Sequence, residues 1–375
     1  MPVRTYLGRM IRRLTALLLL LTGAAPAAAC PDAAIQAWPV PAWTTAAPAD
    51  PGAVAAFEAL AFPPGRDEAD RDGPRTNGLV VVRDGRLVYE RYARGFGPDR
   101  PHIVWSASKS VLQALYGRAV AEGLVDLDRP VAERSPWIGD GDKARITYRE
   151  VLQMRSGIDF TEGYEYAPLF SDVLAMLYTR GRGDMASFAA AQPMAGDPGT
   201  AWAYKSGDSL ILAAALRDLV GPDRYPDYPW TALFDPLGVT SATWERDGQG
   251  TFVGSSYLYL TPRDLARIGL LYLRDGCWAG TRLLPEGWTA FTATPSPALA
   301  GPGIHGAHWW LNRPGPDGER PFAEVPEDLL AASGHWGQKL LVLPSHGLVI
   351  ARTADDRTGF PTGPFLQAAI AAFAP

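Results

Sequence analysis

The apolar positions near the two ends of the chain follow the pattern of β-hairpins. Residues 78–95, GLVVVRDGRLVYERYARG, hold two β-rich runs on either side of Asp84-Gly85, a dipeptide typical of two-residue hairpin turns. Residues 339–355, KLLVLPSHGLVIARTAD, repeat this arrangement around residues 345–347. The sequence therefore predicts two hairpins, one near each end.

Between and after these hairpins, apolar residues recur at helical spacing. From Ser106 they lie three and four residues apart until Gly123, which is typical of a helix end. Thr261-Pro262, followed by Asp264, has the chemistry of a helix start. Residues 158–250 alternate helical runs with loops rich in Gly, Pro and aromatic residues, and further helices are predicted at residues 52–62, 146–158 and 364–374.

This order predicts a sheet built from both ends of the chain, with a helical lobe inserted between them. With 375 residues, 47% of them hydrophobic, the chain can bury a large core. We expect a single α/β (α+β) domain over residues 30–375. Its α/β lobe would comprise about 45–150 and 255–375, and its mostly helical lobe about 151–254.

The first 29 residues have the pattern of an export signal. Arg4, Arg9, Arg12 and Arg13 precede the apolar run LTALLLLLTG, and Ala27-x-Ala29 fits a cleavage site. The run is too short for a stable membrane span. Without these four arginines, 31 basic and 40 acidic residues remain, a net charge of −9. An acidic exported protein is a poor candidate for binding nucleic acid or an anionic membrane, and we expect it to be periplasmic or secreted.

Cys30, the first residue after the expected cleavage site, has alternative fates. Lipidation would produce an outer-membrane lipoprotein, but AAAC lacks the large aliphatic residue usual three positions before a lipidated cysteine. A disulfide with Cys277, the only other cysteine, would tie the N-terminal arm to the body in an oxidising compartment. The two fates exclude each other, and a pair of idle thiols is the third alternative.

The candidate chemistry begins with Ser106 and Lys109, three residues apart at the predicted helix start. Residues at this spacing share a helix face, so the amine can reach the hydroxyl. Burial and the helix dipole both lower a lysine pKa there, and a neutral Lys109 could accept the Ser106 proton. Ser-x-x-Lys alone is weak evidence, because a capping serine and a solvated lysine would explain it equally well.

Two later elements make the pattern more specific. Tyr204 stands in the loop AWAYKSGDS before an apolar helix, and His335 stands in ASGHWGQKL at the entry to a strand. The order Ser-x-x-Lys, Tyr-x-Ser, His-x-Gly resembles the penicillin-recognising serine hydrolases related to class C β-lactamases, with their Ser-x-x-Lys, Tyr-x-Asn and Lys-Thr-Gly-type motifs. The pattern is most similar to the 6-aminohexanoate-dimer hydrolase and esterase branches, and the resemblance runs from about Gly78 to the end.

The resemblance implies a β-lactamase/transpeptidase-like fold, an antiparallel sheet flanked by helices, with the site between its two lobes. It implies that Ser106 is the acyl-accepting nucleophile, Lys109 its base and Tyr204 a proton carrier. It also implies that the backbone N–H groups of Ser106 and Gln338 form an oxyanion hole, and that Ser206, His335 and Gly337 take substrate-binding positions. Trp336, beside the third motif, could form part of the wall of an apolar substrate pocket, and core packing is the alternative for it.

Two departures from the family pattern bear on the substrate. His335 replaces the usual lysine of the third motif, so a permanent positive charge for a substrate carboxylate is missing. Ser206 replaces the usual asparagine, which removes an amide that would bond an acylamino side chain. Both favour an esterase, or an amidase of small linear substrates, over a β-lactamase. Lys205, inside the second motif, could restore some of the missing positive charge or point to solvent, and we expect it to point to solvent.

Other functions have less support in the sequence. β-Lactamase or D,D-peptidase/transpeptidase activity is the alternative among enzymes, and a non-catalytic penicillin-binding-like receptor or regulator is the alternative among binders. The Gly-x-Ser-x-Gly and His-Glu-x-x-His motifs are absent from the sequence, so neither an α/β-hydrolase triad nor a zinc site is predicted. We expect no cofactor and no metal.

Overall fold

The structure is a computed structural model that describes residues 30, 37–65, 72–164, 170–297 and 303–374. The export signal predicted at residues 1–29 lies outside these ranges. Within them, every helix is too short or too polar to cross a lipid bilayer.

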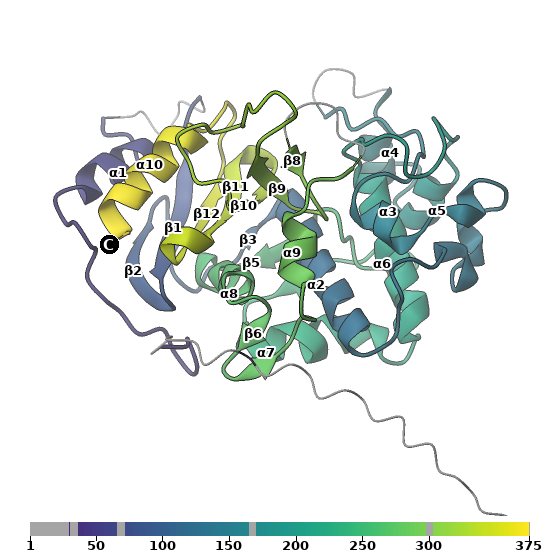
Figure 1. Cartoon of the computed structure of the whole chain (residues 1–375), viewed down its shortest axis with the longest axis horizontal. Helices are drawn as coiled ribbons and strands as arrows, with labels where there is room; N and C mark the ends of the chain where they lie inside the picture. Colours follow the sequence, from purple (N-terminus) through teal and green to yellow (C-terminus); the bar gives the residue numbers. More distant parts are fainter. Residues whose placement is uncertain (1–29, 31–36, 66–71, 165–169, 298–302, 375) are drawn as a thin grey trace, which may run out of the picture.

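A seven-stranded antiparallel sheet forms the centre of one lobe, with strand order β2-β1-β12-β11-β10-β9-β8 (Figure 1). Its first hairpin and its five later strands come from opposite ends of the chain and meet where β1 pairs with β12. Asp84 and Gly85 both have positive φ and form the predicted two-residue turn. The strands are β1 (Thr76–Arg83), β2 (Arg86–Tyr92), β8 (Gly303–His305), β9 (Trp310–Arg313), β10 (Leu330–Gly334), β11 (Gln338–Leu343) and β12 (Leu348–Ala354).

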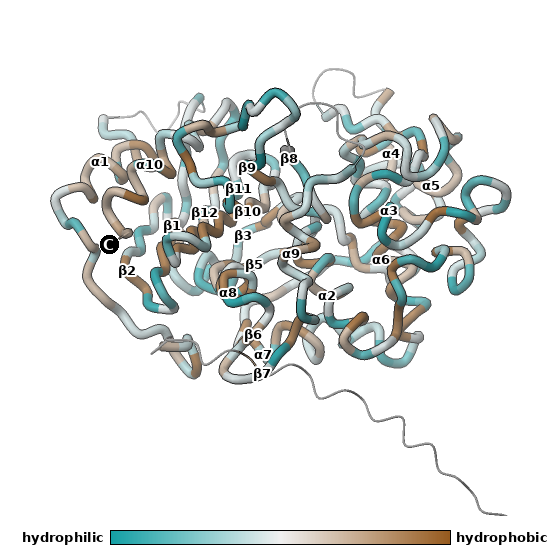
Figure 2. Tube along the Cα trace, in the orientation of Figure 1, coloured by the Kyte–Doolittle hydropathy of each residue, from teal (hydrophilic) through white to brown (hydrophobic). Residues whose placement is uncertain are grey.

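Helices cover both faces of this sheet, because its strands are apolar on both sides (Figure 2). On one face, α1 (Val54–Ala61) packs beside α10 (Thr362–Phe373), and Phe57 stacks on Phe365. On the other face, α8 (Pro262–Leu273) packs against β11 and β12, and α2 (Ser108–Ala121) connects the sheet to the second lobe. The Thr261 side chain caps α8 by accepting a hydrogen bond from the Asp264 backbone, as the sequence predicts.

The second lobe is mostly helical and packs around α6 (Ser206–Val220), which is buried along nearly its whole length. The predicted α+β architecture is therefore confirmed. Helix α3 (Tyr148–Leu152) starts with a capping box but is shorter than predicted. It ends at Leu152 because Met154 adopts a left-handed conformation and Ile158 pairs with Met194 in an extended bridge. The other helices are α4 (Asp172–Tyr178), α5 (Met185–Ala190), α7 (Asp235–Leu237) and α9 (Trp288–Ala293).

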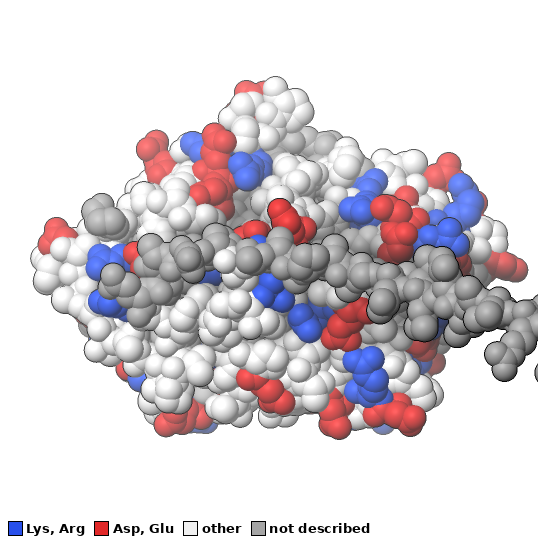
Figure 3. All heavy atoms as spheres, turned by 60° about the horizontal axis from the view of Figure 1, so that its bottom comes forward, with Lys and Arg blue, Asp and Glu red and all other residues white. Residues whose placement is uncertain are grey.

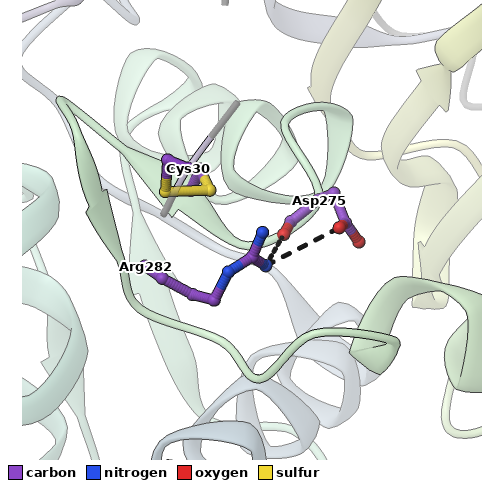
Figure 4. Close-up of a disulfide and its surroundings, with 4 residues drawn as sticks. Cys30, Asp275 and Arg282 are labelled. Carbon is purple, nitrogen blue, oxygen red and sulfur yellow. Dashed lines mark hydrogen bonds and ion pairs between the residues drawn. A yellow bond between two sulfur atoms is a disulfide. The ribbon is translucent and has the colours of Figure 1, made fainter. Parts of the chain in front are cut away.

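Two small sheets complete the fold, one of β3 (His102–Ile103), β5 (Leu258–Leu260) and β4 (Thr243–Trp244), the other of β6 (Cys277–Trp278) and β7 (Thr281–Arg282). Cys30 and Cys277 form a disulfide across 247 residues of sequence (Figure 4). Beside it, Arg282 donates a hydrogen bond of 2.8 Å to the Asp275 carbonyl. Of the alternatives for Cys30, the structure contains the disulfide.

The surface shown in Figure 3 carries acidic and basic side chains intermixed. The described residues on this face show no extended area of one sign.

Candidate active site

Ser106 lies in a tight turn that connects the small sheet to α2. The predicted helix begins two residues later than expected, since residues Trp105–Ala107 form a 3-10 turn and α2 starts at Ser108. Trp105 has φ of +48°, a left-handed conformation that is strained for an aromatic residue. The Val104 backbone is held by a 2.9 Å hydrogen bond to Leu258. The serine therefore sits on a strained turn anchored on its N-terminal side.

Strand β10 passes very close to this turn. A Cβ atom on Gly334 would lie 2.1 Å from the Val104 carbonyl oxygen, so only glycine permits the approach. This contact brings the end of β10, and the turn after it, beside Ser106.

Lys109 is buried directly beneath Ser106. Its Nζ donates hydrogen bonds of 3.0 Å each to Ser106 Oγ, to Ser206 Oγ and to the Ser255 carbonyl. Burial lowers the pKa of Lys109 to about 8, against the opposing effect of the Glu162 carboxylate. Near neutral pH, part of the population then has a neutral amine within reach of the serine proton.

Tyr204 completes the group around Ser106. Burial raises the pKa of Tyr204 well above its ordinary value, the Glu162 charge adds to this rise, and a side-chain hydrogen bond to Ser106 opposes it. The phenol is therefore protonated at neutral pH and suits the role of a proton donor. Its ring stacks on Trp310, with centroids 5.2 Å apart, and lies 5.0 Å from Lys109 Nζ. The structure thus brings together all three residues predicted to be catalytic.

Glu162 is the site residue that the sequence analysis missed. Its carboxylate accepts hydrogen bonds of 2.7 Å from the Ser206 backbone N–H and 2.6 Å from the Ser206 hydroxyl. Burial raises the pKa of Glu162, while Lys109 and the two bonds from Ser206 lower it. Ser206 is the first residue of α6, where free N–H groups and the helix dipole favour an anion. Two hydrogen bonds at the Ser206 hydroxyl therefore connect the Glu162 carboxylate to Lys109.

The third predicted motif forms the turn between β10 and β11. The His335 ring stacks on Tyr164, with centroids 5.0 Å apart, and meets Trp105 edge to face at 5.8 Å. Trp336 also packs edge to face on Trp105, at 5.7 Å, and has a left-handed φ of +59°. His335 and Trp336 thus stand beside the turn that carries Ser106, and their substrate-binding roles stay a prediction.

Hydrogen bonds from buried side chains fix the backbone of this turn. Gln338 Nε2 donates to the carbonyls of His335 and Trp336 at 3.1 and 3.3 Å, and to that of Ala354 at 2.7 Å. Arg352 donates to the Gly337 carbonyl at 2.8 Å. The side chain of Gln338 is thus structural, and the oxyanion role of its backbone N–H stays a prediction.

The prediction for Lys205 is wrong. Its side chain is buried, and Nζ donates to Ser156 Oγ at 2.7 Å and to the Ile158 carbonyl at 3.1 Å. Asp208, on the first turn of α6, lies 3.5 Å from it and accepts a 2.7 Å hydrogen bond from Ser156. Lysine and aspartate three residues apart share a helix face, and here that face points into the lobe instead of into solvent.

The described residues contain no cluster of three or more histidine, cysteine or acidic side chains that could hold a metal ion.

Comparison with known proteins identifies the class. A model of the beta-lactamase family matches residues 68–374, and the chain belongs to this family. It is 31% identical over 221 residues to a 6-aminohexanoate-dimer hydrolase of Paenarthrobacter ureafaciens, covering 57% of this chain and 56% of that protein. It is 30% identical over 104 residues to an esterase/beta-lactamase of Mycobacterium tuberculosis, covering 26% and 24%. The matches thus span about half the length of the first relative and a quarter of the second.

Solved structures share the fold. A family VIII carboxylesterase superposes with a TM-score of 0.60 at 17% identity, over 78% of this chain and 91% of that one. A penicillin-binding protein from Bacillus halodurans superposes with a TM-score of 0.61 at 14% identity, over 79% and 96%. The predicted recognition and fold class are both confirmed: the protein belongs to the beta-lactamase family and has the beta-lactamase fold.

Proposed function

We propose that the protein hydrolyses an ester or amide bond of a small substrate through an acyl-enzyme on Ser106. The observation that carries the proposal is the 3.0 Å hydrogen bond between Lys109 Nζ and Ser106 Oγ, with the pKa of that lysine lowered by burial. A buried amine with a pKa near neutrality is what serine activation by lysine requires.

The reaction divides between two proton carriers. Ser106 Oγ attacks the substrate carbonyl while its proton passes to neutral Lys109, and the carbonyl π electrons move to oxygen. When the tetrahedral intermediate collapses, the leaving group takes a proton through Tyr204, which hydrogen-bonds Ser106. Water then adds to the acyl carbon and gives a proton to the lysine–tyrosine pair. When this second tetrahedral intermediate collapses, the bond between the acyl carbon and Ser106 Oγ breaks, Oγ takes that proton, and the acid is released. The backbone N–H groups of Ser106 and Gln338 would hold the oxyanion.

The residues around the nucleophile favour neutral substrates. Trp105, Tyr164, His335 and Trp336 form an aromatic group beside it, and the third motif has histidine in place of the lysine that would bind a substrate carboxylate. A short-chain ester or a small linear amide fits these surroundings better than an anionic β-lactam.

Labelling with a fluorophosphonate probe tests the nucleophile. Wild type should be labelled on Ser106, and Ser106→Ala should lose both labelling and turnover. Ser108→Ala is the matched control, since the buried Ser108 hydroxyl is engaged by the carbonyls of Trp105 and Ser256 at 2.6 and 2.9 Å. Unlabelled wild type would indicate a non-catalytic binder, and a label on Ser108 would show that the wrong serine has been chosen.

A substrate panel on wild type and Ser106→Ala then separates the enzymatic alternatives. It comprises p-nitrophenyl esters, 6-aminohexanoate oligomers, D-amino-acid amides and nitrocefin. Ester or amide turnover above that of nitrocefin supports the proposal. Efficient nitrocefin turnover, or transfer of the acyl group to an added amine in place of water, would favour a β-lactamase or a transpeptidase.

We further propose that the protein works outside the cytoplasm. The Cys30–Cys277 disulfide supports this, because such bonds persist in oxidising compartments, and a paired Cys30 sulfur cannot carry a lipid. N-terminal sequencing of cell fractions tests it: we expect a mature chain that starts at or near Cys30, and soluble cytosolic protein that retains Met1 would contradict it.

A further inference from the structure

A cavity of about 360 Å³ lies against the face of the seven-stranded sheet that α10 covers. Two of its lining residues, Ala331 and Leu341, pack in the same apolar cluster as α10. Its volume is at the lower end of the range for small-molecule sites. Its lining includes none of the residues assigned to catalysis, and its apolar walls come from Ile304, Trp310, Leu311, Phe322, Ala331 and Leu341.

One cation stands in the wall of this cavity. Lys339 and Ser333 pair across β10 and β11, and Lys339 Nζ donates a 3.1 Å hydrogen bond to Ser333 Oγ. An ammonium has three donors, and within the part of the chain that the structure describes this one has a single acceptor and no carboxylate in an ion pair. Burial lowers the pKa of Lys339 to about 8, which leaves it largely protonated at neutral pH.

The charged side chains next to Lys339, Arg352 and Asp356, form an ion pair with each other. Arg352, beside Lys339 on β12, donates hydrogen bonds of 2.7 and 2.9 Å to the two carboxylate oxygens of Asp356. It also bonds Thr76 and the Gly337 carbonyl. The cavity therefore offers one half-buried positive charge in apolar surroundings, and among the described residues this charge has no carboxylate within ion-pair distance.

We propose that this cavity is a binding site for a linear alkyl monocarboxylate. The carboxylate would accept hydrogen bonds from the Lys339 ammonium and the Ser333 hydroxyl, and the alkyl chain would lie among the apolar walls. A single cation matches a single negative charge. The apolar walls disfavour strongly hydrated anions, such as phosphates, and polar ligands such as sugars.

The site is distinct from the Ser106 site but adjoins it. Trp310 lines the cavity, and its ring stacks on the Tyr204 ring at 5.2 Å. A ligand in the cavity would thus be separated from the catalytic group by one indole ring. The proposal does not depend on the proposed hydrolase activity, and its test does not use turnover.

Isothermal titration calorimetry with sodium hexanoate tests the proposal. We expect hexanoate to bind wild type. Acetate should bind at least about tenfold more weakly, because it buries fewer methylene groups. Hexylammonium and 1-hexanol, which lack the carboxylate, should not bind measurably. Lys339→Met should weaken hexanoate binding by about tenfold or more. Lys143→Met is the matched control and should bind as wild type does, because Lys143 bonds the Ala190 carbonyl in the other lobe.

Two further measurements separate this site from the catalytic one and from a folding defect. Ser106→Ala should bind hexanoate as wild type does, and in crystals soaked with 6-bromohexanoate the bromine should lie between Trp310 and Phe322. The proposal is overturned if wild type does not bind hexanoate, if Lys339→Met with an unchanged Tm binds as tightly, if Ser106→Ala abolishes binding, or if the bromine lies elsewhere.

Discussion

Replacing Glu162 with glutamine should move the pH dependence of catalysis to lower pH. The Ser206 hydroxyl oxygen lies 2.6 Å from Glu162 Oε1 and 3.0 Å from Lys109 Nζ. The carboxylate oxygen and the amine nitrogen are therefore at most about 5.6 Å apart. At an effective dielectric constant of about 20, unit charges at that separation interact by roughly 3 kcal/mol, or about two pKa units. Burial raises the pKa of Glu162, so a full unit charge is an upper value and we expect a shift of about one to two pH units.

The direction of this pH shift depends on which protonation state of Lys109 reacts. Acylation requires the neutral amine, so kcat/KM should rise as pH increases through the Lys109 pKa of about 8. The Glu162 carboxylate favours the ammonium, and its removal lowers that pKa further. The rising limb of the profile should therefore appear at lower pH in Glu162→Gln than in wild type.

The assay is the pH profile of kcat/KM for a p-nitrophenyl ester between about pH 5 and 10, with spontaneous hydrolysis subtracted. Glu133→Gln is the control, because Glu133 is exposed, pairs with Arg129 on the surface and should leave the profile unchanged. A limb in Glu162→Gln that stays in place, or moves to higher pH, would refute the assignment of Lys109 as the base tuned by this carboxylate.

Three other substitutions test the supports of the site. Lys205→Met leaves a buried carboxylate without its cation, and urea denaturation should show a loss of about 3–5 kcal/mol; a loss below about 1 kcal/mol would contradict the buried ion pair. Gly334→Ala forces β10 away from the Val104 carbonyl, so it should lower the free energy of unfolding by about 1–3 kcal/mol and should also lower kcat/KM. Gly97 lies in open space, so the control Gly97→Ala should change neither quantity. His335→Lys restores a permanent charge and should raise kcat/KM for nitrocefin relative to a neutral ester; an unchanged ratio would mean that residue 335 does not select substrate charge.

Local patterns in the sequence predicted the elements that depend on neighbouring residues. Asp84-Gly85 and the Thr261 cap encode a turn and a helix start within a few residues, so both were predictable. The order of the three motifs predicted that Ser106, Lys109 and Tyr204 lie together, because that order follows from the fold of a known family, and the structure brings them together. Their catalytic roles stay a prediction.

Residues that act through long-range contacts were not predictable in this way. Glu162 stands in a loop with no local pattern, and only the folded chain brings its carboxylate to the first turn of α6. Lys205 was misassigned because a lysine between two site residues resembles a surface residue, and its spacing to Asp208 was the one available signal of a buried pair. Lys339 belongs to a predicted strand, but the cavity at its side chain is formed by segments distant in sequence.

The hydrogen bonds that hold the turn after β10 have a consequence for how the substrate selectivity of the proposed hydrolase could change. The backbone carbonyls of residues 335–337 accept hydrogen bonds from the Gln338 and Arg352 side chains and from the Asp356 backbone. Mutations at His335 and Trp336 can therefore alter the chemistry presented to the substrate while the loop keeps its shape. A library randomised at 335 and 336 alone should yield many folded variants with diverged selectivity, whereas one randomised at 338 and 352 should mostly lose the fold.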